Sequence, residues 1–146
     1  MGVKAIPDGY HSVTPYFIVA DATAFIEFLK QAFGAKERGR HLGPAGMIMH
    51  AEVQIGDSVV MLSDESEQFP AATMIINLYV EDVDGAYKRA MQAGGESQRE
   101  PGDQPYGDRS AGVKDRWGNQ WWLATHIEDV SPEEIERRMR AGTPAG

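Results

Sequence analysis

The chain has 146 residues, a formal net charge of -8 and no cysteine. This length is enough for a domain with its own core, and the lack of cysteine excludes disulfide frameworks, thiolate metal sites and a cysteine nucleophile. The acidic balance argues against a nucleic-acid partner, because phosphate binding needs clustered Lys and Arg. The one dense basic stretch, Arg137 to Arg140, follows Glu133, Glu134 and Glu136 and is typical of the solvated face of a short helix. No apolar run approaches the roughly 20 residues of a membrane span, and the N-terminus lacks a signal-peptide apolar region. We therefore expect a cytoplasmic protein with no membrane partner.

The first predicted elements are a strand over 12–19 and a helix that begins after Asp21. The strand segment is rich in strand formers, and Asp21 is a typical N-cap followed by apolar residues at helical spacing. Gly34 closes that helix. Turn residues then separate three further expected strands, at about 37–42, 47–55 and 58–63.

The second half of the chain repeats this order. A strand is expected over 74–80, Asp82 is the next N-cap, and Gly94-Gly95 ends the second helix. A Gly- and Pro-rich insert, Arg99 to Arg109, follows as a candidate lid or rim loop, before strands at about 110–114 and 119–126. Ser131-Pro132 then predicts a short C-terminal helix over about 132–141.

An internal repeat connects the two halves. A shift of 61 positions aligns Val19-Ala20-Asp21 with Val80-Glu81-Asp82 and Gly34 with Gly95, and a shift of 62 matches two turn dipeptides, Gly56-Asp57 and Gly118-Asn119. The economical interpretation is two modules of about sixty residues, each with the order βαβββ. The predicted class is α+β.

Strand alternation sorts side chains onto two faces. In the third strand we expect the face beneath the helix to hold Met47, Met49, Ala51, Val53 and Ile55, with Ile48, His50, Glu52 and Gln54 opposite. In the first strand Val13, Phe17 and Val19 are expected inside, with Thr14, Tyr16 and Ile18 on the other face. If both sheets curve, the faces without helices would line one cavity of aromatic and sparingly polar character, with the candidate ligand-binding residues Tyr16, His50, Glu52, Asn77, Tyr79 and Trp122.

The chemistry open to these side chains has alternatives. His50 and Glu52 stand side by side at i and i+2, as an acid/base pair, as two metal ligands, or as a structural hydrogen-bond pair. The rings of Tyr16, Tyr79 and Trp122 either stack on a planar ligand or fill the cavity.

Other candidates have simpler interpretations. We expect His126 to bond the loop that follows it, Asp108 and Arg109 to pair with each other, and Trp117 and Trp121 to lie in the core or at a dimer interface.

The paired modules resemble the vicinal oxygen chelate superfamily, which groups glyoxalases, bleomycin-resistance proteins and extradiol dioxygenases. The segments that carry the resemblance lie between Tyr10 and Pro132: Tyr10 to Tyr16, Met49-His50-Ala51-Glu52, Ile55 to Ser58, Tyr106 to Arg109, and Asp115 to His126. The resemblance implies one glyoxalase-like domain over 1–146, with modules at about 10–64 and 72–127 that form a curved mixed sheet. It also implies a homodimer, but it does not specify a reaction.

The metal site of that superfamily does not match this sequence. Metal-dependent members typically place ligands at the positions of Thr14, Ile75, Trp122 and either Val60 or Met61, and none of these residues offers an imidazole or a carboxylate. No cofactor is therefore predicted. A divalent metal at a different site, around His50 and Glu52, is the alternative.

Three functions remain open. The first is metal-free binding of a small hydrophobic or aromatic molecule in the cleft of a dimer, and the missing ligands favour it. The second is an enzyme, a lyase, isomerase or dioxygenase-like protein that uses His50 and Glu52. The third is an interaction module without catalysis.

Overall fold

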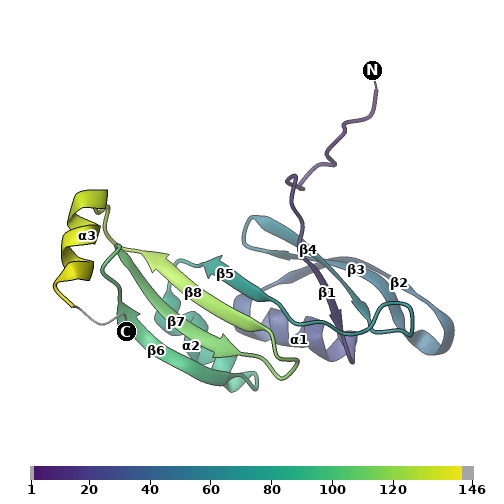
Figure 1. Cartoon of the computed structure of the whole chain (residues 1–146). Helices are drawn as coiled ribbons and strands as arrows, with labels where there is room; N and C mark the ends of the chain where they lie inside the picture. The colour runs from purple at the N-terminus through teal and green to yellow at the C-terminus, as the bar shows by residue number, and fades with distance from the viewer. Residues whose placement is uncertain (1, 143–146) are drawn as a thin grey trace. The chain divides into compact units, whose positions relative to one another are not determined.

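The structure is a computed structural model that describes residues 2–142, so the ends of the expected domain, 1 and 143–146, lie outside the described residues. The chain divides into two compact units, Met1–Met74 and Ile75–Gly146. Each unit carries one four-stranded sheet (Figure 1). No helix among the described residues is long and apolar enough to cross a membrane.

The N-terminal unit is a βαβββ module. Its sheet has the order β1-β4-β3-β2, in which β1 runs parallel to β4 and the other pairs are antiparallel. The helix packs against β1, β3 and β4. The elements are β1 (Tyr16–Val19), α1 (Ala22–Phe33), β2 (Lys36–Leu42), a 3-10 turn (Pro44–Gly46), β3 (Ile48–Ile55) and β4 (Ser58–Asp64).

The C-terminal unit has the same construction. Its sheet order is β5-β8-β7-β6, again with the first pair parallel, and α2 packs against β6, β7 and β8. The elements are β5 (Ile75–Tyr79), α2 (Val83–Gln92), β6 (Glu96–Asp103), β7 (Asp108–Lys114), β8 (Gln120–His126) and α3 (Pro132–Arg140). The predicted α+β class, with two βαβββ modules and a short C-terminal helix, is confirmed.

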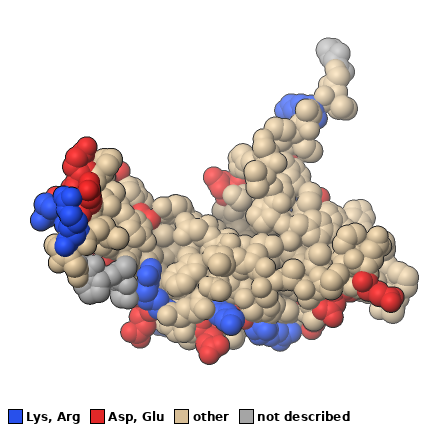
Figure 2. Space-filling view, viewed as in Figure 1, with Lys and Arg blue, Asp and Glu red and all other residues tan. Residues whose placement is uncertain are grey.

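The helices begin at the predicted capping residues. The Asp21 carboxylate accepts the backbone N–H of Ala24 at 3.2 Å, and the Asp82 carboxylate accepts that of Gly85 at 3.1 Å. Ser131 caps α3 in the same way. α3 is otherwise a mixed-charge surface helix with no buried residue, and acidic and basic side chains intermix on it in Figure 2.

A second acceptor completes each of the first two helices, and it comes from the last strand of the same module. Asp64 Oδ1 accepts the N–H of Ala22 at 2.7 Å, and Thr125 Oγ1 accepts the N–H of Val83 at 3.0 Å. Both bonds span 42 residues, and the two pairs are related by the 61-residue shift seen in the sequence. The repeat therefore extends to equivalent hydrogen bonds, even where the acceptor residue differs.

The core of each unit lies between its helix and one face of its sheet. The most buried side chains of the N-terminal unit include Phe17, Phe25, Leu29, Val53 and Leu62, and those of the C-terminal unit include Val83, Ala90, Val113, Trp121 and Leu123. Trp121 is thus a core residue, one of its two expected roles.

A buried aspartate organises the turn between β7 and β8. Asp115 accepts the indole N–H of Trp121 at 2.9 Å, the backbone N–H of Trp117 at 3.0 Å, and both the backbone and side-chain N–H of Asn119. The Asp115-Arg116-Trp117-Gly118-Asn119 segment therefore has a structural role, which is to form this turn.

The first strand is shorter than predicted. It begins at Tyr16, and Val13, which was expected in the core, is 84% exposed. Pro15 has no N–H to donate to a neighbouring strand, so the ladder ends there.

The face assignment of β3 is correct only after His50. Ala51, Val53 and Ile55 are buried beneath the helix as expected, but Ile48 is fully buried and Met49 is 57% exposed. The β2–β3 register shifts between His41, opposite His50, and Leu42, opposite Ile48. This bulge reverses the alternation, so the expected inward positions of Met47 and Met49 were wrong.

The expected insert 99–109 is not a lid loop. Residues up to Asp103 belong to β6, β7 starts at Asp108, and a tight turn joins them, closed by the bond from Gln104 N to Asp108 O at 2.7 Å. β6 is an edge strand with two register shifts, and this setting tolerates Pro101.

Candidate functional site

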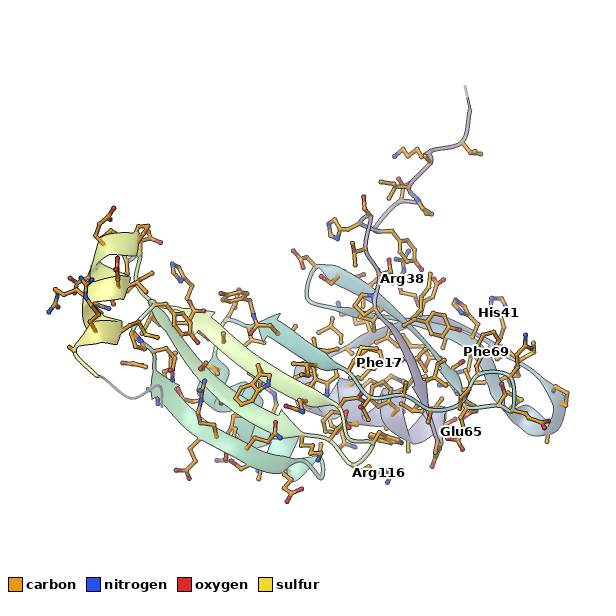
Figure 3. The ribbon with its side chains drawn as sticks, viewed as in Figure 1. Phe17, Arg38, His41, Glu65, Phe69 and Arg116 are labelled. Carbon is orange, nitrogen blue, oxygen red and sulfur yellow. The ribbon has the colours of Figure 1, made fainter. Side chains whose placement is uncertain are left out.

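A pocket of about 620 Å³ lies in the N-terminal unit, on the face of its sheet opposite α1. Tyr16 and Ile18 of β1 line it from the sheet. The other apolar walls come from the turn before β3, from β3 itself and from the segment after β4, where Figure 3 labels Phe69. These contributors are Pro44, Met47, Met49 and Phe69, with Ser63, Asp64, Ser66 and Gln68 as the polar lining.

Local backbone features put these side chains in place. The bulge in β3 turns Met49 away from the core and into the pocket. Phe69 is held by two bonds with Ser66, from Ser66 N to Phe69 O at 2.9 Å and from Phe69 N to Ser66 Oγ at 3.1 Å. A bridge between Ile18 and Ala72 ties this segment to β1. The pocket is therefore built into the module.

Asp64, the acidic residue of the pocket wall, forms hydrogen bonds with the backbone of its own module. Asp64 Oδ1 accepts the N–H of Ala22 and Oδ2 accepts the N–H of Ile48, both at 2.7 Å. Each carboxylate oxygen thus holds a backbone amide of the module. The remaining lining is mainly apolar and rich in methionine and aromatic rings, which adapt to apolar ligands.

Three of the predicted site residues form a hydrogen-bonded cluster beside this pocket. The Tyr16 hydroxyl lies 3.2 Å from His50 Nδ1, and His50 Nε2 lies 3.2 Å from Glu52 Oε2. A neutral His50 with its proton on Nε2 satisfies both bonds, since it then donates to Glu52 and accepts from Tyr16. Tyr16 thereby belongs to both the pocket and the cluster.

The electrostatics of the cluster also involve Tyr10. Burial, followed by the neighbouring Glu52 carboxylate, raises the pKa of Tyr10 to about 12. The Tyr10 hydroxyl, and after it His50, lowers the pKa of Glu52 below its ordinary value. Glu52 is therefore an ionised acceptor near neutral pH.

The C-terminal unit contains a separate cluster around Asp108, which is buried. Tyr79 donates its hydroxyl to Asp108 Oδ2 at 2.7 Å, and His126 Nδ1 lies 2.8 Å from Asp108 Oδ1. The Asp108 carboxylate raises the pKa of Tyr79 and, together with Asp129, that of His126. His126 Nε2 lies 2.7 Å from Asp129 in the following loop, in line with the expected loop bond.

The expected ion pair between Asp108 and Arg109 is wrong. Adjacent residues of a strand point to opposite faces, so Asp108 turns to Tyr79 and His126 while Arg109 turns away. Arg109 binds Asp84 through two nitrogens, at 2.8 and 2.9 Å, and Asp103 at 3.0 Å.

The remaining predicted residues lie on the face of the C-terminal sheet opposite α2. Asn77 and Trp122 are register partners on β5 and β8, and Tyr79 follows two residues later. Tyr16, His50 and Glu52 belong to the N-terminal sheet, and that all six line one cavity stays a prediction. Sequence reasoning missed Met49 and Phe69: the first depends on a bulge, and the second lies in a segment without periodic pattern.

The residues at the ligand positions of the resembled superfamily do not fit a divalent metal. Thr14 precedes β1, Ile75 is exposed on β5, and Met61 and Trp122 occupy matching places on the fourth strand of each module. None carries a donor that such a metal prefers. Across residues 2–142, no three His, Asp or Glu side chains gather closely enough to hold an ion.

Comparisons with known proteins agree with the fold. Residues 10–123 match the model of the Glyoxalase/Bleomycin resistance protein/Dioxygenase superfamily. An uncharacterised protein of Mycobacterium bovis is 34% identical over 139 residues, which cover 88% of this chain and 91% of that protein. An uncharacterised protein of Mycobacterium tuberculosis has the same identity, with 82% of its length covered.

Solved structures show the same architecture. The crystal structure of TioX from Micromonospora sp. ML1 has a TM-score of 0.65 at 24% identity, covering 80% of this chain and all of that one. A family enzyme from Burkholderia phytofirmans has a TM-score of 0.62 at 18% identity, covering 77% and 95%. The chain therefore belongs to the Glyoxalase/Bleomycin resistance protein/Dioxygenase superfamily.

Proposed function

We propose that the protein binds a small hydrophobic or aromatic molecule without the metal used by many members of its superfamily. The observation that carries this proposal is the pocket of about 620 Å³, within the roughly 300–1,000 Å³ range of ligand sites. Ile18, Met47, Met49 and Phe69 supply apolar surface, and burial of that surface provides the binding energy.

Tyr16 is the group that orients the ligand. Its ring lines the pocket, and its hydroxyl is held by His50, which is in turn held by Glu52. A positioned hydroxyl at the edge of an apolar site gives direction to an otherwise non-directional contact.

Further parts of the proposal extend beyond the pocket. Asn77, Tyr79 and Trp122 are proposed to contact the ligand from the C-terminal sheet, and the protein is proposed to act as a cytoplasmic homodimer with its ligand in the dimer cleft. Ile75 and Tyr79 are both more than half exposed on that sheet, which supports a partner there. Sedimentation equilibrium tests the dimer. A protein that stays monomeric at concentrations up to about 100 μM contradicts it.

Binding is tested with the neutral aromatic probe 2-naphthamide by titration calorimetry. Met49→Glu places a charge in the pocket wall, and we expect it to weaken binding about tenfold or more. Met139→Glu is the matched control, because Met139 is 54% exposed on α3 and Met49 is 57% exposed. Equal affinity in the two variants, or no binding by the parent protein, contradicts the proposed pocket.

The second candidate is an enzyme of the lyase, isomerase or dioxygenase-like kind. The hydrogen-bonded chain from Tyr16 through His50 to Glu52 favours an enzyme. Tyr16 faces the pocket, and His50, held by Glu52, can accept the proton of the Tyr16 hydroxyl. His50→Gln then abolishes turnover of a bound ligand while its affinity changes little. Stoichiometric divalent metal in protein purified without a His tag would contradict the metal-free proposal and support the enzyme.

A further inference from the structure

A row of four residues crosses the C-terminal sheet on the face opposite α2. Asn77 on β5 pairs with Trp122 on β8, Trp122 pairs with Gly112 on β7, and Gly112 pairs with Arg99 on β6. Side chains in such a row share a face. The row therefore places an amide, an indole and a guanidinium side by side.

Gly112 allows the indole to lie over the sheet. A Cβ at this position would come within 2.4 Å of Trp122 Cζ3, so any larger residue would displace the ring. Across the glycine, the guanidinium carbon of Arg99 lies 5.0 Å from the centre of the Trp122 ring. This is a cation–π arrangement, which fixes both groups.

Among the residues that the structure describes, Arg99 has no acidic partner, in contrast to Arg109 and Arg138 of the same unit. Arg109 and Arg138 each bind two carboxylates, whereas Arg99 Nη2 donates to the neutral hydroxyl of Ser110. Its Nε is buried and, among residues 2–142, meets no acceptor. A half-buried guanidinium without an acidic partner is a costly feature, and an anion on its remaining Nη N–H groups would offset that cost.

The equivalent row of the N-terminal sheet contains a charged residue of the opposite sign. It runs Tyr16, Met61, Glu52 and Gly39, so its charged residue is a carboxylate. That carboxylate is satisfied within its own unit by His50. The guanidinium of the C-terminal row has no such counterpart among the described residues of its unit. Asp108, on the same strand as Ser110, already bonds Tyr79 and His126.

We propose that Arg99, Ser110 and Trp122 form a subsite for the carboxylate of a planar aromatic acid. The Nη N–H groups that do not bond Ser110 donate to the carboxylate, Ser110 steadies the guanidinium, and the aromatic part of the acid stacks beside the indole. The subsite adds a charge requirement to the proposed binding of an aromatic molecule, and in that respect it rests on the proposed function.

The test compares 2-naphthoate with its neutral isostere 2-naphthamide. In low salt at pH 7, we expect the parent protein to bind the acid about tenfold or more tightly than the amide. Arg99→Gln should remove this preference, because it lowers the affinity for the acid much more than the affinity for the amide. Arg116→Gln is the matched control, since Arg116 carries the same charge and also stacks on an indole, with its guanidinium carbon 4.5 Å from the ring centre of Trp117.

A second measurement locates the site and guards against misfolding. In ¹⁵N spectra of the parent protein, 2-naphthoate should shift the Trp122 indole and the amides of Ser110 and Gly112. Ser110→Ala leaves the stack in place and should lower the preference by less than Arg99→Gln does. Equal affinities for acid and amide, a preference that survives Arg99→Gln, or shifts confined to the other unit overturn the subsite.

The two proposals fail in different ways. Amide binding that Met49→Glu abolishes, with no preference for the acid, refutes the subsite alone. Acid binding that depends on Arg99 and ignores Met49→Glu refutes the pocket alone.

Discussion

The Tyr16 hydroxyl lies 3.2 Å from His50 Nδ1, and this contact joins the apolar pocket to a charged cluster. On the far side of the imidazole, Glu52 fixes which nitrogen carries the proton. A ligand that hydrogen-bonds to Tyr16 therefore competes for the same hydroxyl, and its arrival is transmitted to the ring of His50.

Tyr16→Phe keeps the ring and removes this hydroxyl. We expect the Nε2-protonated form of His50 to lose population, because the acceptor at Nδ1 no longer has a donor. The change in unfolding free energy should stay below about 1 kcal/mol, since the pair is solvent-accessible. Two-bond ¹H–¹⁵N spectra of the imidazole measure the tautomer. Tyr106→Phe is the control, and an unchanged tautomer in Tyr16→Phe would contradict the described bond.

Glu52→Gln should lower the pKa of Tyr10 from about 12 while leaving it above 10, because burial is the larger cause and remains. The pKa of Tyr10 is measured from its Cζ chemical shift as a function of pH.

The same variant tests the contribution of Glu52 to stability. The pKa of Glu52 is lowered in the folded state, so this contribution is present above its unfolded pKa and is lost as pH falls through the folded value. The stability gap between parent and variant should accordingly shrink below about pH 4. A gap that widens in acid would refute this assignment.

His126→Gln tests the cluster around Asp108. The pKa of His126 is raised by Asp108 and Asp129, so its stabilising contribution is fully present below the unfolded value of about 6.5 and is lost as pH rises through the folded value. Denaturant unfolding between pH 5.5 and about 8.5 should show the parent's advantage over the variant falling across that window. His11→Gln, at an exposed position, should track the parent throughout. An advantage that grows with pH would reverse the sign and reject the mechanism.

Gly112→Ala places a methyl group where the Trp122 ring lies. The ring must move, so we expect a loss of about 1–3 kcal/mol in unfolding free energy and loss of the contact with Arg99. Gly39→Ala is the control, because Gly39 is a strand glycine at the end of the N-terminal row, opposite Glu52, and a Cβ there meets no atom within 4 Å. Equal losses in the two variants would show that Trp122 does not depend on Gly112.

Features that depend on local pattern were predictable from the sequence. Asp21, Asp82 and Ser131 were recognisable as caps because an N-cap acts within three residues, and Gly34 as a helix end because its conformation is local. The 61-residue repeat predicted the module plan, because it compares the chain with itself.

Features that depend on pairing between strands were not predictable in the same way. The exposure of Met49 follows from a bulge against β2, which alternation within β3 alone cannot reveal. Arg99 was not predicted as a site residue, because its Gly- and Pro-rich segment is typical of a loop, although in the structure it lies on the edge strand β6. Its place beside Trp122 depends on the register of three strands, so no single segment carries the signal.

The bonds from Ala22 to Asp64 and from Val83 to Thr125 make the first turn of each helix depend on the last strand of its own module. If a helix forms early, the N–H group of its first residue has no acceptor until the strand 42 residues later has packed beside it. The two amides are therefore natural reporters of folding: each becomes protected from hydrogen exchange only when its own module has closed. Their protection times would show whether the two halves of the chain close together or one after the other.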